Sequence, residues 1–148
     1  MFKHILIPTD GSELSGQAGR RAIELAKTLK AKVTLVLVSP TFRQLADEGL
    51  LLPEITTDKR TWEKSASGRA RKMLDAAAAE ARDAGVPCET THVFRDQPHA
   101  AIVDTAKKSG CDLIVMGSHG YGGFKQWVLG SETTRVLSHS KIPVLVYR

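Results

Sequence analysis

The sequence predicts one three-layer α/β domain over residues 1–148, built on a five-stranded and mostly parallel sheet. Short apolar runs rich in branched residues alternate with longer segments whose apolar residues recur at helical spacing, which is the pattern of parallel α/β folds. The strand-like runs are too continuously apolar for a half-exposed sheet, so helices should cover both faces. With 148 residues, 42% of them hydrophobic, the chain is long enough for one ordinary core.

The first third of the chain predicts a strand, a helix and a second strand. Phe2 to Thr9 forms the first strand, Asp10-Gly11-Ser12 a turn, and Lys32 to Val38 the second strand. Between them a helix starts at Glu13, because apolar side chains recur at helical spacing, at Leu14, Ala18, Ala22, Leu25, Ala26 and Leu29. A strand, a helix and a strand in this order imply a right-handed parallel crossover.

A long connection and a long helix follow. Ser39 to Lys59 is irregular and contains Pro40 and Pro53. Loops of this length in compact domains are usually functional or mobile, so we expect either a flap beside a ligand site or a variable surface loop. The helix runs from about Thr61 to Gly85. The side chains expected to lie against the sheet are Ala66, Ala70, Met73, Ala77 and Ala81.

The second half of the chain repeats the alternation. Pro87 to Phe94 predicts a third strand whose mixed polar and apolar residues suit a sheet edge. Gln97-Pro98 starts a short helix that has proline in its first turn and ends at Gly110. Cys111 to Met116 predicts the fourth strand and Ile142 to Tyr147 the fifth. A glycine-rich segment and a further helix separate these last two strands.

Glycines cluster where the fourth strand ends, in Gly117-Ser118-His119-Gly120-Tyr121-Gly122-Gly123, and again at Gly130. Glycine lets backbone N–H groups converge on an anion without a Cβ in the way. A helix beginning at Ser131 would add its own unpaired N–H groups, so the segment predicts a phosphate site. A Cβ at Gly117 or Gly130 would then block the phosphate without touching the core. The alternative is a flexible surface loop in which Ser131 is an ordinary N-cap.

The spacing of glycine, two residues, glycine, nine residues, glycine and serine, from Gly117 to Ser131, resembles the nucleotide-binding motif of the universal stress protein family. Ile5 to Ser12 resembles the opening strand and acidic turn of that family, and Pro143 to Val146 resembles its closing strand. The resemblance implies a Rossmann-like fold, similar to that of adenine nucleotide alpha hydrolases, with strand order 3-2-1-4-5. It also implies that the protein binds ATP, with or without Mg²⁺.

In open α/β sheets, ligands bind beyond the carboxyl ends of the strands, where the strand order reverses. In the implied order, Asp10 and Gly117 face each other across that crevice. Asp10 either contacts ribose hydroxyls or a metal, or is a turn residue that bonds its own backbone. The Val38 backbone is expected to contact the adenine edge, and no residue is assigned a catalytic role. The nucleotide-binding residues that the resemblance implies are Pro8, Thr9, Asp10, Val38, Met116, Gly117, His119, Gly120, Gly130, Ser131, Glu132 and Thr133.

Glu132 stands where the family commonly has an uncharged residue. A carboxylate roughly 8 Å from a phosphate would cost about 2 kcal/mol at an effective dielectric of about 20. Glu132 is therefore expected either to point away from the phosphate or to act through a cation such as Mg²⁺. Lys125 either contacts phosphate or is solvated, and His119 is expected to be a polar loop residue and not a base.

The composition argues against several classes of function. The net charge of +5 comes from basic residues spread over two helix patterns with acidic residues between them, so we expect a solvated surface and no nucleic-acid partner. No apolar run approaches the roughly 20 residues of a membrane span, and the chain begins with a strand pattern and not a signal peptide, so we expect a cytoplasmic protein. Cys88 and Cys111 lack the spacing of a redox motif or zinc site and are expected to be reduced thiols in or near the core.

The resemblance favours a cytoplasmic, ATP-binding regulatory module of the stress response, which passes its nucleotide-bound state to an unidentified protein partner. One alternative is a slow ATPase or nucleotidyl transferase that uses Asp10 and Mg²⁺, although neither a Walker A nor a G-x-S-x-G motif is present. The other alternative is a dimeric interaction protein that binds no nucleotide. The last strand presents Ile142, Val144 and Val146 on an apolar edge, which predicts a homodimer through this strand.

Overall fold

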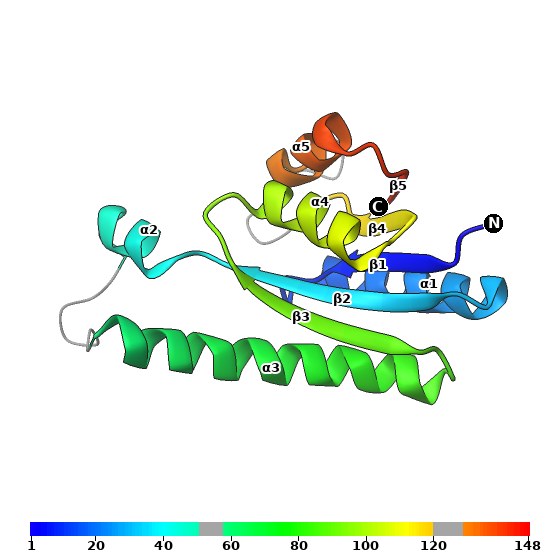
Figure 1. Cartoon of the computed structure of the whole chain (residues 1–148), viewed down its shortest axis with the longest axis horizontal. Coiled ribbons are helices and arrows are strands. Elements are labelled where there is room, and N and C mark those ends of the chain that lie inside the picture. The colour runs from blue at the N-terminus through cyan, green and yellow to red at the C-terminus, as the bar shows by residue number, and fades with distance from the viewer. Residues whose placement is uncertain (51–57, 120–128) are drawn as a thin grey trace.

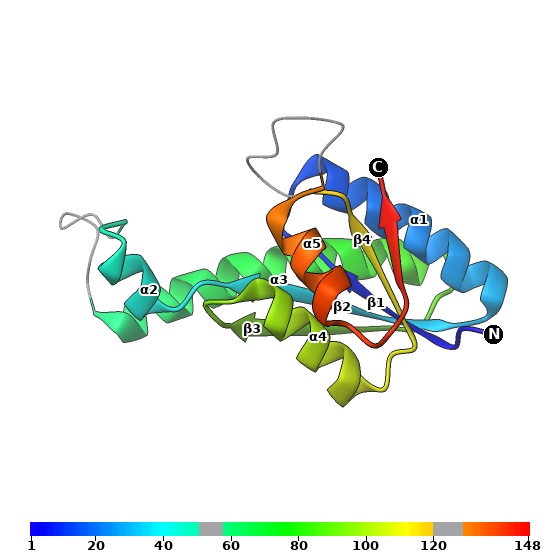
Figure 2. The same cartoon turned by 90° about the horizontal axis from the view of Figure 1, so that it is seen from above.

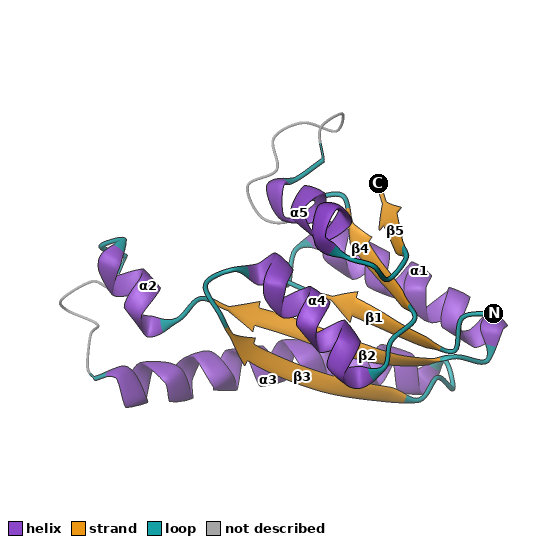
Figure 3. Cartoon of the chain, turned by 45° about the horizontal axis from the view of Figure 1, so that its top comes forward, coloured by secondary structure: helices purple, strands orange, loops and turns teal. Residues whose placement is uncertain are grey.

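Five parallel strands form the central sheet: β1 (His4–Pro8), β2 (Lys32–Ser39), β3 (Cys88–Phe94), β4 (Leu113–Gly117) and β5 (Val144–Tyr147). Their spatial order is β3-β2-β1-β4-β5, which confirms the predicted sheet and places β3 and β5 at its edges (Figure 3). The structure is a computed structural model that describes residues 1–50, 58–119 and 129–148.

Helices cover both faces of the sheet, as predicted for a three-layer domain. They are α1 (Glu13–Leu29), α2 (Phe42–Asp47), α3 (Lys59–Asp83), α4 (Pro98–Ser109) and α5 (Ser131–His139). Figure 1 shows α3 on one side of the sheet and α4 and α5 on the other, and Figure 2 shows the sheet and α4 and α5 from above. Among the described helices, none combines the length and the apolar character that a membrane span needs.

Each face of the sheet has its own hydrophobic core, because successive side chains of a strand point to opposite faces. Ile5 and Ile7 of β1 pack in one core with buried residues of α1 and α3. Leu6, which lies between them, packs in the other core with buried residues of α4 and α5. The strands nearest the centre are therefore buried on both sides, which accounts for their continuous apolar sequences.

The long helix α3 lies on the sheet mainly through small side chains. Ala66, Ala70 and Ala81 are buried as predicted, and Ala77 is partly buried against the same core. The prediction for Met73 was wrong, because this side chain is 39% exposed. Leu74, four residues after Ala70 on the same helix face, is 3% exposed and takes the core position.

The connection after β2 contains a short helix where the sequence predicted irregular structure. Thr41 begins α2 as its N-cap, since its side-chain oxygen accepts the Gln44 N–H at 3.1 Å. The ring of Phe42 packs on Trp62 of α3, which packs on Phe94 of β3, with ring centroids 5.8 Å and 5.7 Å apart. Figure 1 shows α2 and the first turns of α3 extending beyond the sheet. Residues 51–57 of this connection lie outside the described residues.

Both cysteines are unpaired thiols, as predicted. Cys88 is half-buried at the start of β3, and Cys111 is buried just before β4. Burial raises the pKa of the Cys88 thiol and raises that of Cys111 to about 11. Both sulfurs therefore stay protonated near neutral pH.

A buried histidine lies at the start of β1. His4 is 5% exposed, and its Nε2 lies 2.7 Å from Oγ1 of Thr34 on β2. The Asp112 carboxylate holds the same end of the sheet by accepting the His4 N–H at 3.0 Å. Burial first, and then the positive charge of Lys32, lower the pKa of His4 below its usual value of 6.5.

We predict that the free energy of unfolding decreases as the pH falls below 6.5. The unfolded chain binds a proton at His4 more readily than the folded chain, so this contribution is present above the unfolded pKa and is lost as the pH falls towards the lowered folded pKa. Burial lowers the pKa of His92 in the same sense. Urea unfolding at about pH 7.5 and about pH 5.5 measures the loss. The decrease in the free energy of unfolding between these pH values should be smaller in His4→Gln than in the wild-type protein, and smallest in the double variant with His92→Gln. An equal decrease in all three proteins would contradict the prediction.

Candidate functional site

A cavity of about 440 Å³ opens at the carboxyl ends of β1, β2 and β4. The strand order reverses between β1 and β4, since the chain continues from β1 to β2 on one side and from β4 to β5 on the other. This is the place where open α/β sheets bind their ligands. The lining residues are Pro8, Thr9, Asp10, Ser15, Val36, Val38, Pro98, Ile102, Met116, Gly117, His119, Gly130, Ser131, Glu132 and Thr133.

Every predicted site residue within the described part of the chain lines this cavity. Gly120, which completes the predicted set, and Lys125 lie outside the described residues. The connection after β2 was expected to form a flap or a surface loop. Its described part, residues 39–50, contributes no residue to the lining of the cavity. These residues therefore give no evidence for a flap.

Four lining residues were missed by the sequence prediction. Val36 could have been found, because it lies two residues before Val38 and therefore on the same face of β2. Ser15 lies in the first turn of α1, just after the predicted turn Asp10-Gly11-Ser12. Pro98 and Ile102 lie on α4 and reach the cavity because α4 packs beside α5, which no local pattern in the sequence indicates.

The turn between β1 and α1 presents Asp10 at one side of the cavity. The Thr9 N–H continues the sheet by donating to Val36 O at 2.9 Å, and Gly11 then turns the chain with φ of +80°. Oδ1 of Asp10 accepts the Ser12 N–H at 2.9 Å. The turn role considered for Asp10 is therefore present, and it orients an exposed carboxylate at the cavity edge.

On the other side, the end of β4 is joined to the start of α5 by backbone and side-chain hydrogen bonds. The Ser118 N–H donates to Tyr147 O at 2.7 Å, and the Gly130 N–H donates to Ser118 O at 2.7 Å. The buried Thr133 hydroxyl donates to Gly117 O at 3.0 Å. These contacts fix the first turn of α5 directly beside the carboxyl end of β4.

The two described glycines of the motif allow this close packing. A Cβ on Gly130 would lie 3.0 Å from His119 Cα and 3.2 Å from Ser118 O. A Cβ on Gly117 would lie 3.2 Å from Cγ of Leu14. The expectation that a side chain at these positions would obstruct only a ligand was therefore wrong, because it would first meet the protein itself.

The N-terminus of α5 faces the cavity. Gly130 is its N-cap residue and Ser131 its first residue, so the alternative in which Ser131 is the N-cap is wrong. The Thr134 N–H makes the first bond within the helix, to Gly130 O at 3.0 Å. The preceding N–H groups of Ser131, Glu132 and Thr133 therefore have no acceptor within the helix, and all three residues line the cavity. Such a helix terminus favours a bound anion.

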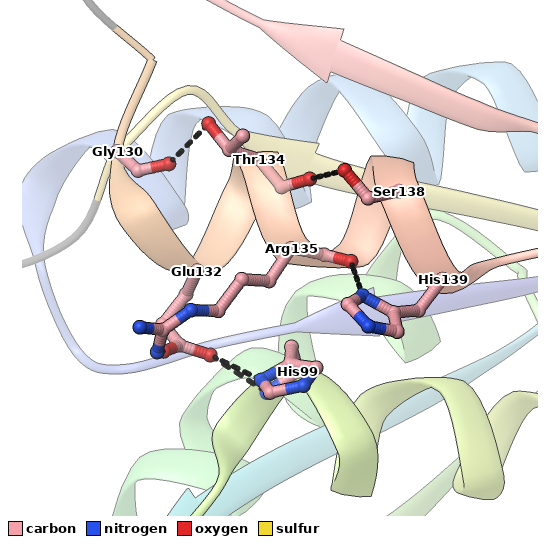
Figure 4. A network of polar contacts seen from close by, with 7 residues as sticks. All are labelled: His99, Gly130, Glu132, Thr134, Arg135, Ser138 and His139. Atoms are coloured by element: carbon pink, nitrogen blue, oxygen red, sulfur yellow. Dashed lines mark hydrogen bonds and ion pairs between the residues drawn. The ribbon is translucent and has the colours of Figure 1, made fainter.

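Glu132 is directed towards α4 (Figure 4). Its Oε2 accepts the backbone N–H of His99 at 2.8 Å and lies 3.3 Å from Nδ1 of the same residue. Its Oε1 lies 2.8 Å from Nη1 of Arg135. The carboxylate is therefore engaged by protein groups, which is consistent with the expectation that it points away from a phosphate. Within the described part of the chain, no three His, Cys, Asp or Glu side chains are placed to hold a metal ion.

The wall between these two polar sides is apolar. Its side chains are those of Pro8, Val36, Val38, Pro98, Ile102 and Met116. The Val36 C=O accepts the N–H of Thr9, which follows β1. The Ser39 C=O accepts the N–H of Arg95, which follows β3. Because strand backbone groups alternate in direction, the N–H and C=O of Val38 point to the β1 side, where β1 has already ended at Pro8. A flat apolar ligand on this wall would meet a backbone donor and acceptor at its edge.

His119 lies where β4 leads into the glycine-rich segment. It is half-buried, and its Nδ1 is 3.1 Å from the Ser118 Oγ. Its backbone packs against Gly130, so this residue helps to hold α5 in place. No contact to a carboxylate that would orient it as a general base is found for His119 among the described residues.

Comparisons with known proteins give a consistent result over the whole chain. A sequence profile of the universal stress protein family matches residues 1–148. Universal stress protein YxiE from Bacillus subtilis (strain 168) is 33% identical over 151 residues, which cover 100% of both proteins. The solved structure of MJ0577, a universal stress protein of Methanocaldococcus jannaschii, superposes with a TM-score of 0.79 at 30% identity, covering 99% of this chain and 95% of that one.

Two more distant solved structures contain nucleotides. One is a universal stress protein in complex with cAMP, 24% identical with a TM-score of 0.67, covering 99% of this chain and 97% of the other. The second is the universal stress protein from Archaeoglobus fulgidus in complex with dAMP, 21% identical with a TM-score of 0.68, covering 100% and 98%. At these identities the likeness concerns the fold.

We predict that Gly130→Ala lowers the free energy of unfolding by about 1 kcal/mol, because its Cβ would press on backbone atoms that cannot easily move. Gly68→Ala on α3 is the matched control. A Cβ there meets no atom within 4 Å, and alanine is favoured over glycine inside a helix, so this variant should be stabilised by about 0.5–1 kcal/mol. Urea unfolding measures both changes. A gain of stability in Gly130→Ala would show that the start of α5 has room for a side chain.

Proposed function

This chain belongs to the universal stress protein family, and from that premise we propose that it is an ATP-binding regulatory module of the stress response, acting in the cytoplasm through a protein partner. The observation that carries the proposal is one cavity in which the N-terminus of α5 faces the turn with Asp10, with an apolar wall between them. These three parts suit the phosphates, the ribose and the adenine of one nucleotide. Universal stress proteins of this fold bind cAMP and dAMP, which supports an adenine nucleotide as the ligand.

The adenine ring is assigned to the apolar wall. Val36, Val38 and Ile102 offer side chains on which a flat ring can pack. The Val38 backbone supplies an N–H and a C=O at the edge of that wall, which suits the alternating acceptors and donors of adenine. Burial of the ring removes apolar surface from water at about 25 cal/mol per Å², so we expect this contact to contribute much of the affinity.

The phosphates are assigned to the first turn of α5. A helix N-terminus stabilises an anion by about 0.3–1 kcal/mol, or about 2 kcal/mol when partly buried, whereas micromolar affinity corresponds to about 8 kcal/mol. The helix terminus alone is therefore insufficient. The Thr133 hydroxyl proton is already donated to Gly117 O, so Thr133 would offer its backbone N–H and Ser131 both its N–H and its hydroxyl.

The ribose is assigned to Asp10, whose carboxylate can accept hydrogen bonds from sugar hydroxyls while Oδ1 keeps the Ser12 N–H. This placement puts Asp10 away from the terminal phosphate. Fast hydrolysis needs a group that positions water in line with that phosphate. Glu132 is engaged by His99 and Arg135, which disfavours it for that role. We therefore propose that any turnover of ATP is slow.

We predict micromolar binding of ATP by the purified protein, with turnover far below the enzyme median of about 10 s⁻¹. Asp10→Ala should weaken the affinity about tenfold, since a hydrogen bond to a charged group contributes about 1.5–3 kcal/mol. Asp10→Asn keeps an oxygen for the Ser12 N–H and should weaken binding by a smaller factor. Titration calorimetry measures the affinities, and mass spectrometry of the denatured protein identifies any nucleotide retained during purification.

Three results would contradict parts of this proposal. An absence of adenine-nucleotide binding at millimolar concentrations would remove the nucleotide function. Turnover of several per second that is lost in His119→Ala would replace the regulatory role by catalysis. Wild-type affinity in Asp10→Asn, together with weak binding in Asp10→Ala, would assign Asp10 to the turn alone.

We also propose that the protein is a homodimer through β5. This strand forms one edge of the sheet, and edge strands tend to pair with other chains. Val144 is partly buried against the core on the α4 and α5 face, so a charge there would damage the fold. Leu145 points to the other face and is 43% exposed, which makes it the better position to test.

We predict that the wild-type protein sediments as a dimer at tens of micromolar and that Leu145→Asp sediments as a monomer with an unchanged circular dichroism spectrum. The introduced carboxylate would lose its hydration in a β5 interface. Met73→Asp is the control, because Met73 is exposed to a similar extent, 39%, but lies on α3. A wild-type monomer, or a dimer that persists in Leu145→Asp, would rule out this interface.

A further inference from the structure

The carboxylate of Glu132 joins the N-termini of two helices. It belongs to the first turn of α5, and its Oε2 accepts the backbone N–H of His99, the second residue of α4, at 2.8 Å. Gln97, the N-cap residue of α4, makes no side-chain capping bond. The cap of α4 is thus supplied by a residue 33 positions away in the sequence.

The position of this carboxylate suits both helices. The first turn of a helix favours a negative charge, and Glu132 lies in that turn of α5 while capping the same end of α4. Arg135, one turn later on α5, binds its second oxygen at 2.8 Å. The side chain is 33% exposed, and Figure 4 shows it between α5 and α4. Glu132 also belongs to the lining of the cavity.

The two helices joined in this way border different parts of the cavity. Pro98, directly before His99, and Ile102, one turn later, belong to the apolar wall. Ser131 and Thr133, on either side of Glu132, belong to the helix terminus that faces the cavity. The bond from Glu132 to His99 therefore links the α4 part of the apolar wall to the terminus of α5.

We propose that Glu132 is a positioning residue of the nucleotide site, which holds the α4 part of the adenine wall, Pro98 and Ile102, and the phosphate-binding terminus of α5 at the spacing that one nucleotide spans. This inference rests on the proposed function. A ligand held at both ends gains affinity when its two subsites are already correctly spaced. Removal of the acceptor should therefore weaken ATP binding, even though it also removes a negative charge near the phosphates.

If the role of Glu132 were purely electrostatic, its removal would have the opposite effect on ATP affinity. If Glu132 only repelled the phosphates, both Glu132→Gln and Glu132→Ala would tighten ATP binding. In the positioning role, Glu132→Gln keeps an oxygen that can accept the His99 N–H, so the conservative variant should retain the affinity that alanine loses.

The experiment measures ATP affinity by calorimetry for the wild-type protein, Glu132→Gln and Glu132→Ala. We expect Glu132→Ala to bind about tenfold more weakly and Glu132→Gln to lie within about threefold of wild type. Glu13→Ala is the matched control and should leave the affinity unchanged, since Glu13 is an exposed acidic residue in the first turn of α1. Glu132→Asp, which is one methylene shorter, provides a second disruptive variant if alanine impairs folding.

Hydrogen exchange of the His99 amide gives a readout that needs no ligand. Exchange should be faster in Glu132→Ala than in the wild-type protein and slow in Glu132→Gln. Equal ATP affinities in all variants, tighter binding in both, or equal weakening in both would overturn the positioning role. A wild-type protein that binds no adenine nucleotide would instead overturn the proposed function, and this inference with it.

Discussion

The packing of α5 against the end of β4 is so close that a Cβ at Gly130 would press on the two residues that follow β4, and the geometry of the cavity depends on this contact. The Gly130 N–H reaches Ser118 O at 2.7 Å, and a Cβ on Gly130 would lie 3.0 Å from His119 Cα. The same packing aims the first N–H groups of α5 into the crevice between β1 and β4. No lysine or arginine is found among the described residues that line the cavity. In the proposed function, the described groups that would attract the phosphates are therefore mainly backbone N–H groups of α5, whose position is set by the packing of the fold.

The two carboxylates at the cavity are compatible with an anion because each already has backbone partners at a helix N-terminus. Oδ1 of Asp10 accepts the Ser12 N–H just before α1, and Oε2 of Glu132 accepts the His99 N–H at the start of α4. Helix N-termini carry partial positive charge, which offsets these carboxylates locally. Arg135 adds a full positive charge beside Glu132. Charge near the cavity is thus distributed over three helix ends and one ion pair, and the apolar wall lies between them.

The sequence patterns were sufficient for the strands, the large helices and the glycine-rich side of the cavity, because these follow from apolar runs, helical spacing and the position of glycines at a strand end. The other predicted residues of the cavity came from the family resemblance. The strand order came from the family resemblance, since periodicity does not specify which strands are neighbours. What was missed depends on tertiary contacts: Pro98 and Ile102 line the cavity only through the packing of α4 on α5. The placement of Met73 in the core failed because helical spacing alone did not fix which residue of the pair Met73 and Leu74 faces the sheet.

The two cysteines have a consequence for the behaviour of the protein towards oxidants. Peroxides and disulfides react with the thiolate and hardly with the thiol. With its pKa raised to about 11 by burial, Cys111 is ionised in about one molecule in 10,000 at pH 7, and burial disfavours the Cys88 thiolate as well. The two cysteines therefore offer oxidants very little thiolate. Cys88 and Cys111 should therefore stay in the thiol form when the surrounding redox potential becomes more oxidising.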